Sequence, residues 1–324
     1  MKRKFKSVFA GCLASTIFTS FPAGAAVGFT FDFSGTGGNL WTQPAKDSLT
    51  SAAETVAALF ANYNATVSMQ VSGSNANTST LASAGANFTT IPMDSFGSRG
   101  DVAELILSNG TYTINPGSFA GTVDANFFHN WSFTNMVAGN EFDFTSTMIH
   151  ELTHALGFNS LIAQTGGSAF MSRRFSPFDS FLADGSGTKV VDLSLASGTG
   201  ATWNTASIGG TGTSPATANS GLYFDGPNAV AANGGNLIPI YSPSPWEEGS
   251  SGSHLDDAFY TGANGKLMNA ATLPGPGART FDPIELGILR DIGYLQIVPE
   301  PSGPLLLCFG ATLAICTRKR RSAI

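Results

Sequence analysis

The chain has 324 residues, of which 42% are hydrophobic and only 12% are charged, and its formal net charge is −6 at pH 7. Half of its Lys and Arg residues lie in the two termini, so the chain between them is strongly acidic. This charge excludes nucleic acid as an expected partner, because phosphate binding requires a basic surface. A chain of this length can bury one substantial core or two small ones.

The first 25 residues are typical of a secretory signal peptide. Basic residues precede an apolar run at 8–21, and Ala23-Gly24-Ala25 follows it. A basic region, a short apolar region and a small-residue cleavage site occur in this order in signal peptides. We therefore expect export and cleavage after Ala25. An uncleaved anchor is the alternative, but the apolar run is short for a membrane span.

The next part, up to residue 133, predicts a mixed sheet with packed helices. Apolar and polar residues alternate at 27–33 and at 67–71, as in strands with one buried face. Between them, Ser51 and Glu54 have the spacing of a capping box for a helix that continues through Phe60. Farther along, residues 72–86 predict a loop, 102–107 a short helix or strand, and 127–133 a strand.

The most informative stretch is DFTSTMIHELTHALGFN, residues 143–159. Asp143 is a suitable N-cap, apolar residues recur at helical spacing, and Gly157 can end the helix in a left-handed conformation. His150 and His154 are four positions apart, so a helix places them on one face. Two imidazoles in that position can bind one metal ion.

Glu151 lies directly beside the first of these histidines. Zinc binds imidazole nitrogens readily, and catalytic zinc sites keep three protein ligands and a water molecule. A carboxylate at this position can reach that water, so we expect Glu151 to act as the general base of a hydrolysis. A helix that merely exposes two histidines is the alternative interpretation.

Residues 160–245 predict a loop-rich insertion. Phe178, Phe181 and Leu182 are expected to form a buried cluster, followed by a glycine turn and a strand. Asp179 and Asp184 are candidate calcium or zinc ligands, but isolated Asp beside Ser and Gly more commonly caps turns, and we expect that use here. Residues 197–220 are rich in Gly, Thr, Ser and Ala and predict a long loop.

A third zinc ligand must come from outside the helix. The chain contains only two further histidines, His129 and His254, and none of its three cysteines lies between residues 26 and 297. Zinc therefore has no cysteine ligand in that region, and no disulfide can stabilise it. We expect His129 to line a substrate cleft or to pack. A carboxylate such as Asp179 or Glu247 stays open as the alternative third ligand.

Three segments together resemble the leishmanolysin-type branch of the metzincin metallopeptidases, and also bacterial PEP-CTERM metalloproteases. The segments are HELTHALGF at 150–158, SGSHLDDAFYTGANGKLMNA at 251–270 and FDPIELGILRDIGY at 281–294. The resemblance implies that His254 is the third Zn²⁺ ligand after a large insertion, and that Met268 forms the Met-turn beneath the zinc. Ser160 stands where metzincins without this insertion carry their third histidine.

The expected fold is α+β and zincin/metzincin-like. It would comprise an N-terminal mixed sheet with helices, the central HExxH helix, and a loop-rich C-terminal subdomain with the Met-turn and a final helix. Residues 26–297 would then form a secreted or cell-surface zinc endopeptidase that acts on proteins or peptides. The alternative function is a surface or matrix protein whose zinc site is only structural.

The last 27 residues resemble a PEP-CTERM sorting signal of Gram-negative bacteria. A VPEP box at 298–301 is followed by an apolar stretch at 304–317 and a basic cluster at 318–321. The resemblance implies processing by a membrane exosortase, transient membrane association through the tail, and a final location at the cell surface or outside the cell. A plain C-terminal membrane anchor is the alternative.

Overall fold

The computed structural model describes residues 26–164, 173–194 and 221–298. The predicted signal peptide, most of the predicted sorting tail and the whole of the predicted loop at 197–220 lie outside them. Up to the central helix the elements are β1 (Val27–Asp32), α1 (Gln43–Ala58), β2 (Ala65–Ser74), β3 (Ala82–Ala86), α2 (Asp101–Leu107), β4 (Gly121–Asn126), β5 (Trp131–Ser132), β6 (Phe142–Asp143) and α3 (Phe144–Ala155). Beyond it follow β7 (Leu182–Ala183), β8 (Leu222–Phe224), α5 (Pro227–Ala232), β9 (Ile238–Ile240) and α6 (Pro283–Asp291). The α+β class is confirmed.

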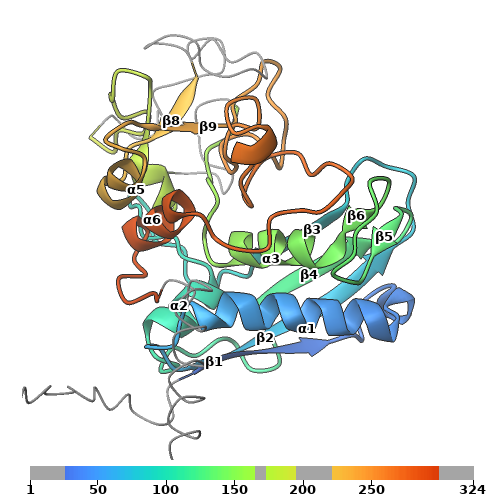
Figure 1. Cartoon of the computed structure of the whole chain (residues 1–324). Coiled ribbons are helices and arrows are strands. Elements are labelled where there is room, and N and C mark those ends of the chain that lie inside the picture. The colour runs from blue at the N-terminus through green and yellow to red at the C-terminus, as the bar shows by residue number, and fades with distance from the viewer. Residues whose placement is uncertain (1–25, 165–172, 195–220, 299–324) are drawn as a thin grey trace, which may run out of the picture.

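A mixed four-stranded sheet organises the first half of the chain (Figure 1). Its order is β1-β2-β4-β3, in which β1, β2 and β4 are parallel and β3 is the antiparallel edge strand. In β2, Val67, Met69 and Val71 are fully buried, whereas Thr66, the second residue of the strand, is exposed. The two strands predicted from alternation are therefore confirmed.

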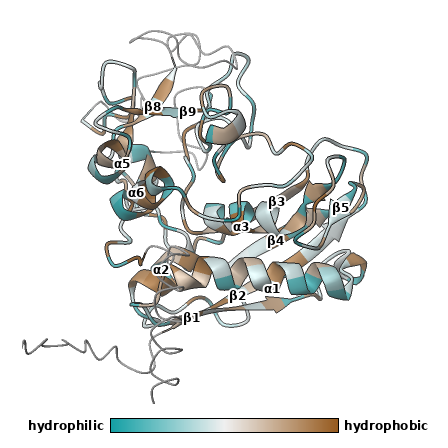
Figure 2. Ribbon diagram, in the orientation of Figure 1, coloured by the Kyte–Doolittle hydropathy of each residue, from teal (hydrophilic) through white to brown (hydrophobic). Residues whose placement is uncertain are grey.

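Helices α1 and α3 pack against each other on this sheet, α1 against β1 and α3 against β3 and β4. Helix α1 begins at Gln43, with Pro44 in its first turn, where a missing N–H costs nothing. The predicted capping box is wrong, because Ser51 and Glu54 lie inside the helix. In Figure 2 the turns of α1 alternate between hydrophilic and hydrophobic colours, as expected of a helix with one buried side.

Two further expectations for this half are wrong. The predicted loop at 72–86 contains the end of β2 and the whole of β3. The predicted strand at 127–133 is a turn followed by the two residues of β5, because β4 already ends at Asn126. The segment at 102–107, predicted as a short helix or strand, is helix α2.

An aromatic cluster fixes the first residue of α3 against the sheet. The ring of Phe144 lies 5.6 Å from Trp41, 5.0 Å from Trp131 and 4.9 Å from Phe133, measured between centroids. Trp41 also donates a 2.8 Å hydrogen bond from its indole nitrogen to the carbonyl of Ser72 in β2. Such contacts bury large apolar areas with preferred geometry, so they set where the helix starts.

The region predicted as a loop-rich insertion contains regular structure. Strands β7, β8 and β9 form a three-stranded antiparallel sheet, and α5 packs against α6. Phe178 and Leu182 are fully buried as predicted, and Phe181 is partly buried. The strand predicted after the glycine turn is wrong, since Lys189 and Val191 form only isolated bridges in the described residues up to 194, the first of them with Ala183. Helix α6 confirms the predicted final helix.

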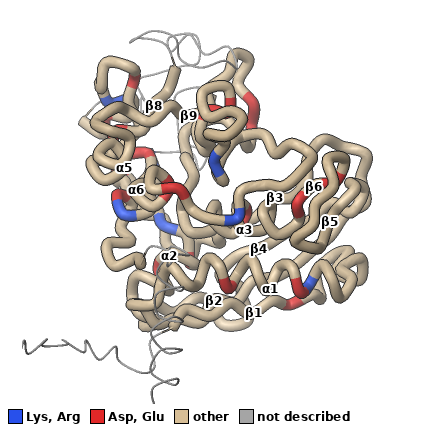
Figure 3. Tube along the Cα trace, in the orientation of Figure 1, with Lys and Arg blue, Asp and Glu red and all other residues tan. Residues whose placement is uncertain are grey.

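Charged side chains are thinly scattered over the trace (Figure 3). Within the described ranges, no helix combines the length and the apolar character that a membrane span requires.

Candidate metal centre

Helix α3 is fixed at both ends. The Asp143 carboxylate accepts a 3.0 Å hydrogen bond from the Ser146 amide, which confirms the predicted N-cap. At the other end Gly157 has φ +97°, a left-handed conformation that confirms its predicted role. The Tyr294 hydroxyl then donates a 2.8 Å hydrogen bond to the carbonyl of Leu156. The helix therefore presents its histidines from a rigid support.

His254 reaches the helix from the loop after β9. Its carbonyl accepts a 2.9 Å hydrogen bond from the Tyr241 amide, and the Leu255 amide donates a 2.8 Å bond to the carbonyl of Met268. Leu255 thus forms bridges to both Ile240 and Asn269. These backbone bonds hold His254 between β9 and the segment that carries Met268.

The structure brings together the three histidines that the sequence singled out. Their Nε2 atoms lie 3.0 Å apart for His150 and His154, 2.9 Å for His154 and His254, and 3.1 Å for His150 and His254. His150 and His254 are buried, and His154 is half-buried. The three residues can hold a metal ion.

The other ring nitrogen of each histidine is committed to the backbone. His150 Nδ1 lies 2.7 Å from the carbonyl of Leu267, His154 Nδ1 lies 2.8 Å from that of Phe158, and His254 Nδ1 lies 2.7 Å from that of Ser250. A carbonyl only accepts, so each Nδ1 must carry the proton. Each neutral ring then directs an Nε2 lone pair to the common centre, where three lone pairs without a cation would repel one another.

Burial keeps these imidazoles neutral. It lowers the pKa of His150, lowers that of His154 well below its ordinary value, and lowers the pKa of His254 to about 3. The neighbouring histidines add to this effect for His154 and His254, because two positive rings repel. Neutral imidazole is the form that binds metal, so the set suits a cation at neutral pH.

Glu151 lies beside this cluster and lines the same cleft. It is 8% exposed, and its burial raises the pKa of the carboxyl group to about 8, while a hydrogen bond with the backbone of Ala84 in β3 acts in the opposite direction. A cation at the three histidines would favour the ionised form. Glu151 is thus a buried carboxyl group whose pKa lies close to neutral pH.

A cleft of about 620 Å³ opens over the cluster. Its floor includes the three histidines and Glu151, and one wall includes residues 79–84, which contain the first part of β3. The opposite wall comes from residues 248–250 and 270–272. The cleft therefore lies between the edge of the main sheet and the second half of the chain.

Met268 is fully buried and follows Leu267, whose carbonyl binds His150. The Met268 amide donates a 2.8 Å hydrogen bond to Oε1 of Glu285, a carboxylate of α6 that is itself fully buried. Oε2 of Glu285 accepts from the Asp282 amide at 2.7 Å, completing a capping box. Sequence reasoning missed this role of Glu285. The only signal was the Asp-x-x-Glu spacing at the start of the final helix.

The alternative ligands lie outside the cluster. His129 Nε2 lies 3.0 Å from the carbonyl of Thr80, and its ring packs on Trp131 and Phe142. The Asp179 carboxylate instead accepts hydrogen bonds from Ser160, Leu161 and Ser176, the structural use that was expected. Asp184 likewise caps its own turn, accepting from the amides of Ser186 and Thr188, and Glu247 accepts from the Tyr241 hydroxyl.

No protein family model matches this chain, and no curated protein matches it either.

Proposed function

We propose that this chain is an exported, zinc-dependent endopeptidase of the metzincin type, with His150, His154 and His254 as ligands. The convergence of three Nε2 lone pairs beside a buried Glu151, at the floor of an open cleft, is the observation that carries the proposal. Among the described residues the cluster contains no fourth histidine or carboxylate ligand. A set of three protein ligands is that of a catalytic zinc site, in which one coordination position stays open.

The spacing of the nitrogens supports zinc. Tetrahedral coordination with Zn–N bonds of about 2.0–2.1 Å places neighbouring nitrogens about 3.3 Å apart. The observed separations of 2.9–3.1 Å are only slightly shorter. Each ring also has the backbone acceptor at Nδ1 that orients metal-ligating histidines. The donor set therefore fits the ion.

In the proposed reaction a side chain of the protein transfers the proton. When bound, zinc supplies Lewis acidity, which polarises a peptide carbonyl and increases the acidity of water. Glu151 takes a proton from the attacking water and passes it to the nitrogen of the leaving amine. Its burial excludes bulk water as a competing proton acceptor, and its bond to Ala84 orients the carboxyl group.

The edge strand β3 is the part of the cleft best suited to bind a peptide. Among the described strands it pairs only with β4, and the backbone of Ala84 forms a hydrogen bond with Glu151 rather than with another strand. Ala82, Ser83 and Ala84 line the cleft beside Glu151. An extended peptide can add to such an edge through backbone hydrogen bonds, which are independent of its sequence. This supports a polypeptide substrate.

A purely structural zinc site would place different demands on the protein. It would be closed by a fourth protein ligand and would need no general base. Here Glu151 and a cleft of about 620 Å³ adjoin the three histidines. These features favour catalysis over the structural alternative.

Metal removal tests the proposal. We expect the purified protein to contain one zinc ion per chain and to cleave an unstructured polypeptide such as denatured casein. Dialysis against a chelator should abolish cleavage, and stoichiometric zinc should restore it, because the ligands are preorganised by backbone bonds. Bound zinc without cleavage of any unstructured substrate would instead identify a structural site.

We also propose that both termini are processed during export. The mature chain would begin at Ala26 and lose its C-terminal sorting signal to an exosortase-type enzyme, after a transient membrane association. Intact-mass measurement of the protein recovered from the surface or medium of a Gram-negative host checks both ends. An unprocessed N-terminus, or a retained tail in a host that has the exosortase, would contradict the corresponding half.

A further inference from the structure

A second cavity, of about 330 Å³, adjoins the cleft over the metal centre. The two share Ala271 and Thr272 as lining residues. Residues 271–274 and 276–278 line the second cavity, and Ser146 of α3 lines the same space. Residues 271–278 are here called the wall segment. A substrate lying in the cleft could therefore place a side chain in this cavity.

The wall segment contains no helix or strand, so its position depends on its attachments. Three residues before its start, the backbone of Met268 forms hydrogen bonds with the Leu255 amide and the Glu285 carboxylate. Near its end, the Gly275 amide donates a 2.7 Å hydrogen bond to the carbonyl of Glu141, and the carbonyl of Ala278 accepts a 2.5 Å bond from the Ser146 hydroxyl. The intervening residues span the cavity.

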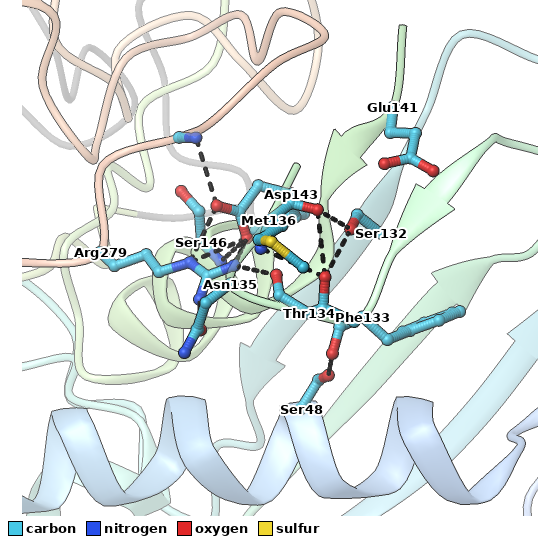
Figure 4. Close-up of polar contacts among 12 residues, drawn as sticks. Ser48, Ser132, Phe133, Thr134, Asn135, Met136, Glu141, Asp143, Ser146 and Arg279 are labelled. Carbon is cyan, nitrogen blue, oxygen red and sulfur yellow. Dashed lines mark hydrogen bonds and ion pairs between the residues drawn. The ribbon is translucent and has the colours of Figure 1, made fainter. Parts of the chain in front are cut away.

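Arg279 makes the strongest of these attachments (Figure 4). Its guanidinium donates to both carboxylate oxygens of Asp143, with distances of 2.8 Å from Nε to Oδ2 and 2.8 Å from Nη2 to Oδ1. It also donates a 2.8 Å hydrogen bond to the carbonyl of Thr134 and a further bond to Asn135. Asp143 is almost fully buried, so water screens this ion pair weakly.

One carboxylate thus serves two elements. Asp143 caps α3, seven residues before His150. It also binds Arg279, the residue directly after the wall segment. The Gly277 amide adds a 3.2 Å hydrogen bond to the same carboxylate. The approach is close, because a Cβ on Gly277 would lie 2.4 Å from the Ser146 hydroxyl oxygen. The wall is fixed directly to the helix that carries the metal ligands.

We propose that Arg279 is a positioning residue for substrate specificity. By joining the wall segment to the N-terminus of α3, it sets the width of the second cavity and so determines which substrate side chain next to the cleaved bond is accepted. This inference rests on the proposed peptidase function. Arg279 touches neither the metal ligands nor Glu151 in its recorded contacts, so its effect is on substrate binding.

The test compares Arg279→Met and Arg279→Lys with the wild type on peptides that carry Ala, Leu, Phe or Gln on either side of the cleaved bond. For Arg279→Met we expect unchanged zinc content, an increase in KM of about tenfold for the larger side chains, and a change in kcat of less than about threefold. Arg279→Lys should recover part of the loss, because lysine keeps the charge without the two-pronged geometry. Lys189→Met, which breaks an exposed ion pair with Asp225, is the matched control and should leave KM unchanged.

A second variant and a second measurement make the result independent of Arg279→Met folding correctly. Gly277→Ala should displace the wall without removing the ion pair, and should change the same side-chain preference. Amide hydrogen exchange across 269–281 should become at least about tenfold faster in the Arg279 variants, with or without zinc. Wild-type exchange and preference in folded Arg279→Lys and Gly277→Ala would refute the positioning role. If the wild type cleaves no peptide, the proposed function fails, while the exchange rates still decide the role of Arg279.

Discussion

Replacing Glu151 by Gln should lower kcat for peptide hydrolysis by about 10²- to 10⁴-fold, the range that positioned general bases contribute. Glutamine keeps the size and shape of the buried side chain but cannot accept a proton from water. Zinc content should not change, because Glu151 is not among the clustered ligands. The measurements are kcat on a fluorogenic peptide, zinc by elemental analysis and the thermal midpoint.

Glu54→Gln is the matched control for this variant. It makes the same chemical change at an exposed position on α1, so activity should stay at the wild-type level. An equally active Glu151→Gln protein would remove the general base from the proposed mechanism. Loss of zinc together with activity would show instead that Glu151 acts on the metal site itself.

The His254→Ala protein should bind zinc at least about 100-fold more weakly, since loss of a group that only orients a ligand already costs 10- to 100-fold. The two remaining histidines lie on one helix and leave the side of the centre next to β9 open. Peptidase activity should disappear with the metal. Isothermal titration of the metal-free protein with zinc measures the change.

His129→Ala is the matched control, because the same side chain is removed outside the cluster. Its zinc affinity should equal that of the wild type. Unchanged affinity in His254→Ala would mean that the third ligand lies elsewhere, and the metzincin-type proposal would fall. The backbone bonds of His254 do not involve the ring, so the variant should remain folded.

Local features of the site were predictable because they depend on spacing within one helix. The Asp143 cap, the common face of His150 and His154, and the left-handed Gly157 all follow from bonds between residues at most four positions apart. The strands at 27–33 and 67–71 were also predictable from local spacing. Their period of two is visible in the sequence without knowledge of their partners.

The position of His254 beside His150 and His154 did not follow from local spacing. It was expected from a count of the remaining histidines and from a resemblance, whereas the structure places it through the backbone bond of His254 with Tyr241 and that of Leu255 with Met268. Nothing in the local sequence shows that Nδ1 of His150 will find the carbonyl of Leu267, 117 positions away. The three acceptors are Leu267, next to Met268, Phe158, just beyond the end of α3, and Ser250, in the loop before His254.

The wrong predictions have separate causes. Strand β3 reads ASAGA, a sequence of low strand propensity, and it exists because β4 pairs with it and α3 packs on it. The start of α1 was misplaced because Thr42 caps it without a side-chain hydrogen bond, whereas Ser51 and Glu54 imitate a capping box inside the helix. The small sheet of β7, β8 and β9 consists of strands of two or three residues, too short to show a period.

By itself, the sequence determined the helix that carries His150, Glu151 and His154, and its boundaries, because one turn of helix converts a spacing of four residues into a shared face. Tertiary structure alone decided that the carbonyl of Leu267 orients His150, that an edge strand lies beside Glu151, and that Arg279 is attached to Asp143. Two of those contacts, His150 with Leu267 and Arg279 with Asp143, join residues more than a hundred positions apart. Their formation depends on the burial of the whole core, and no local pattern records it.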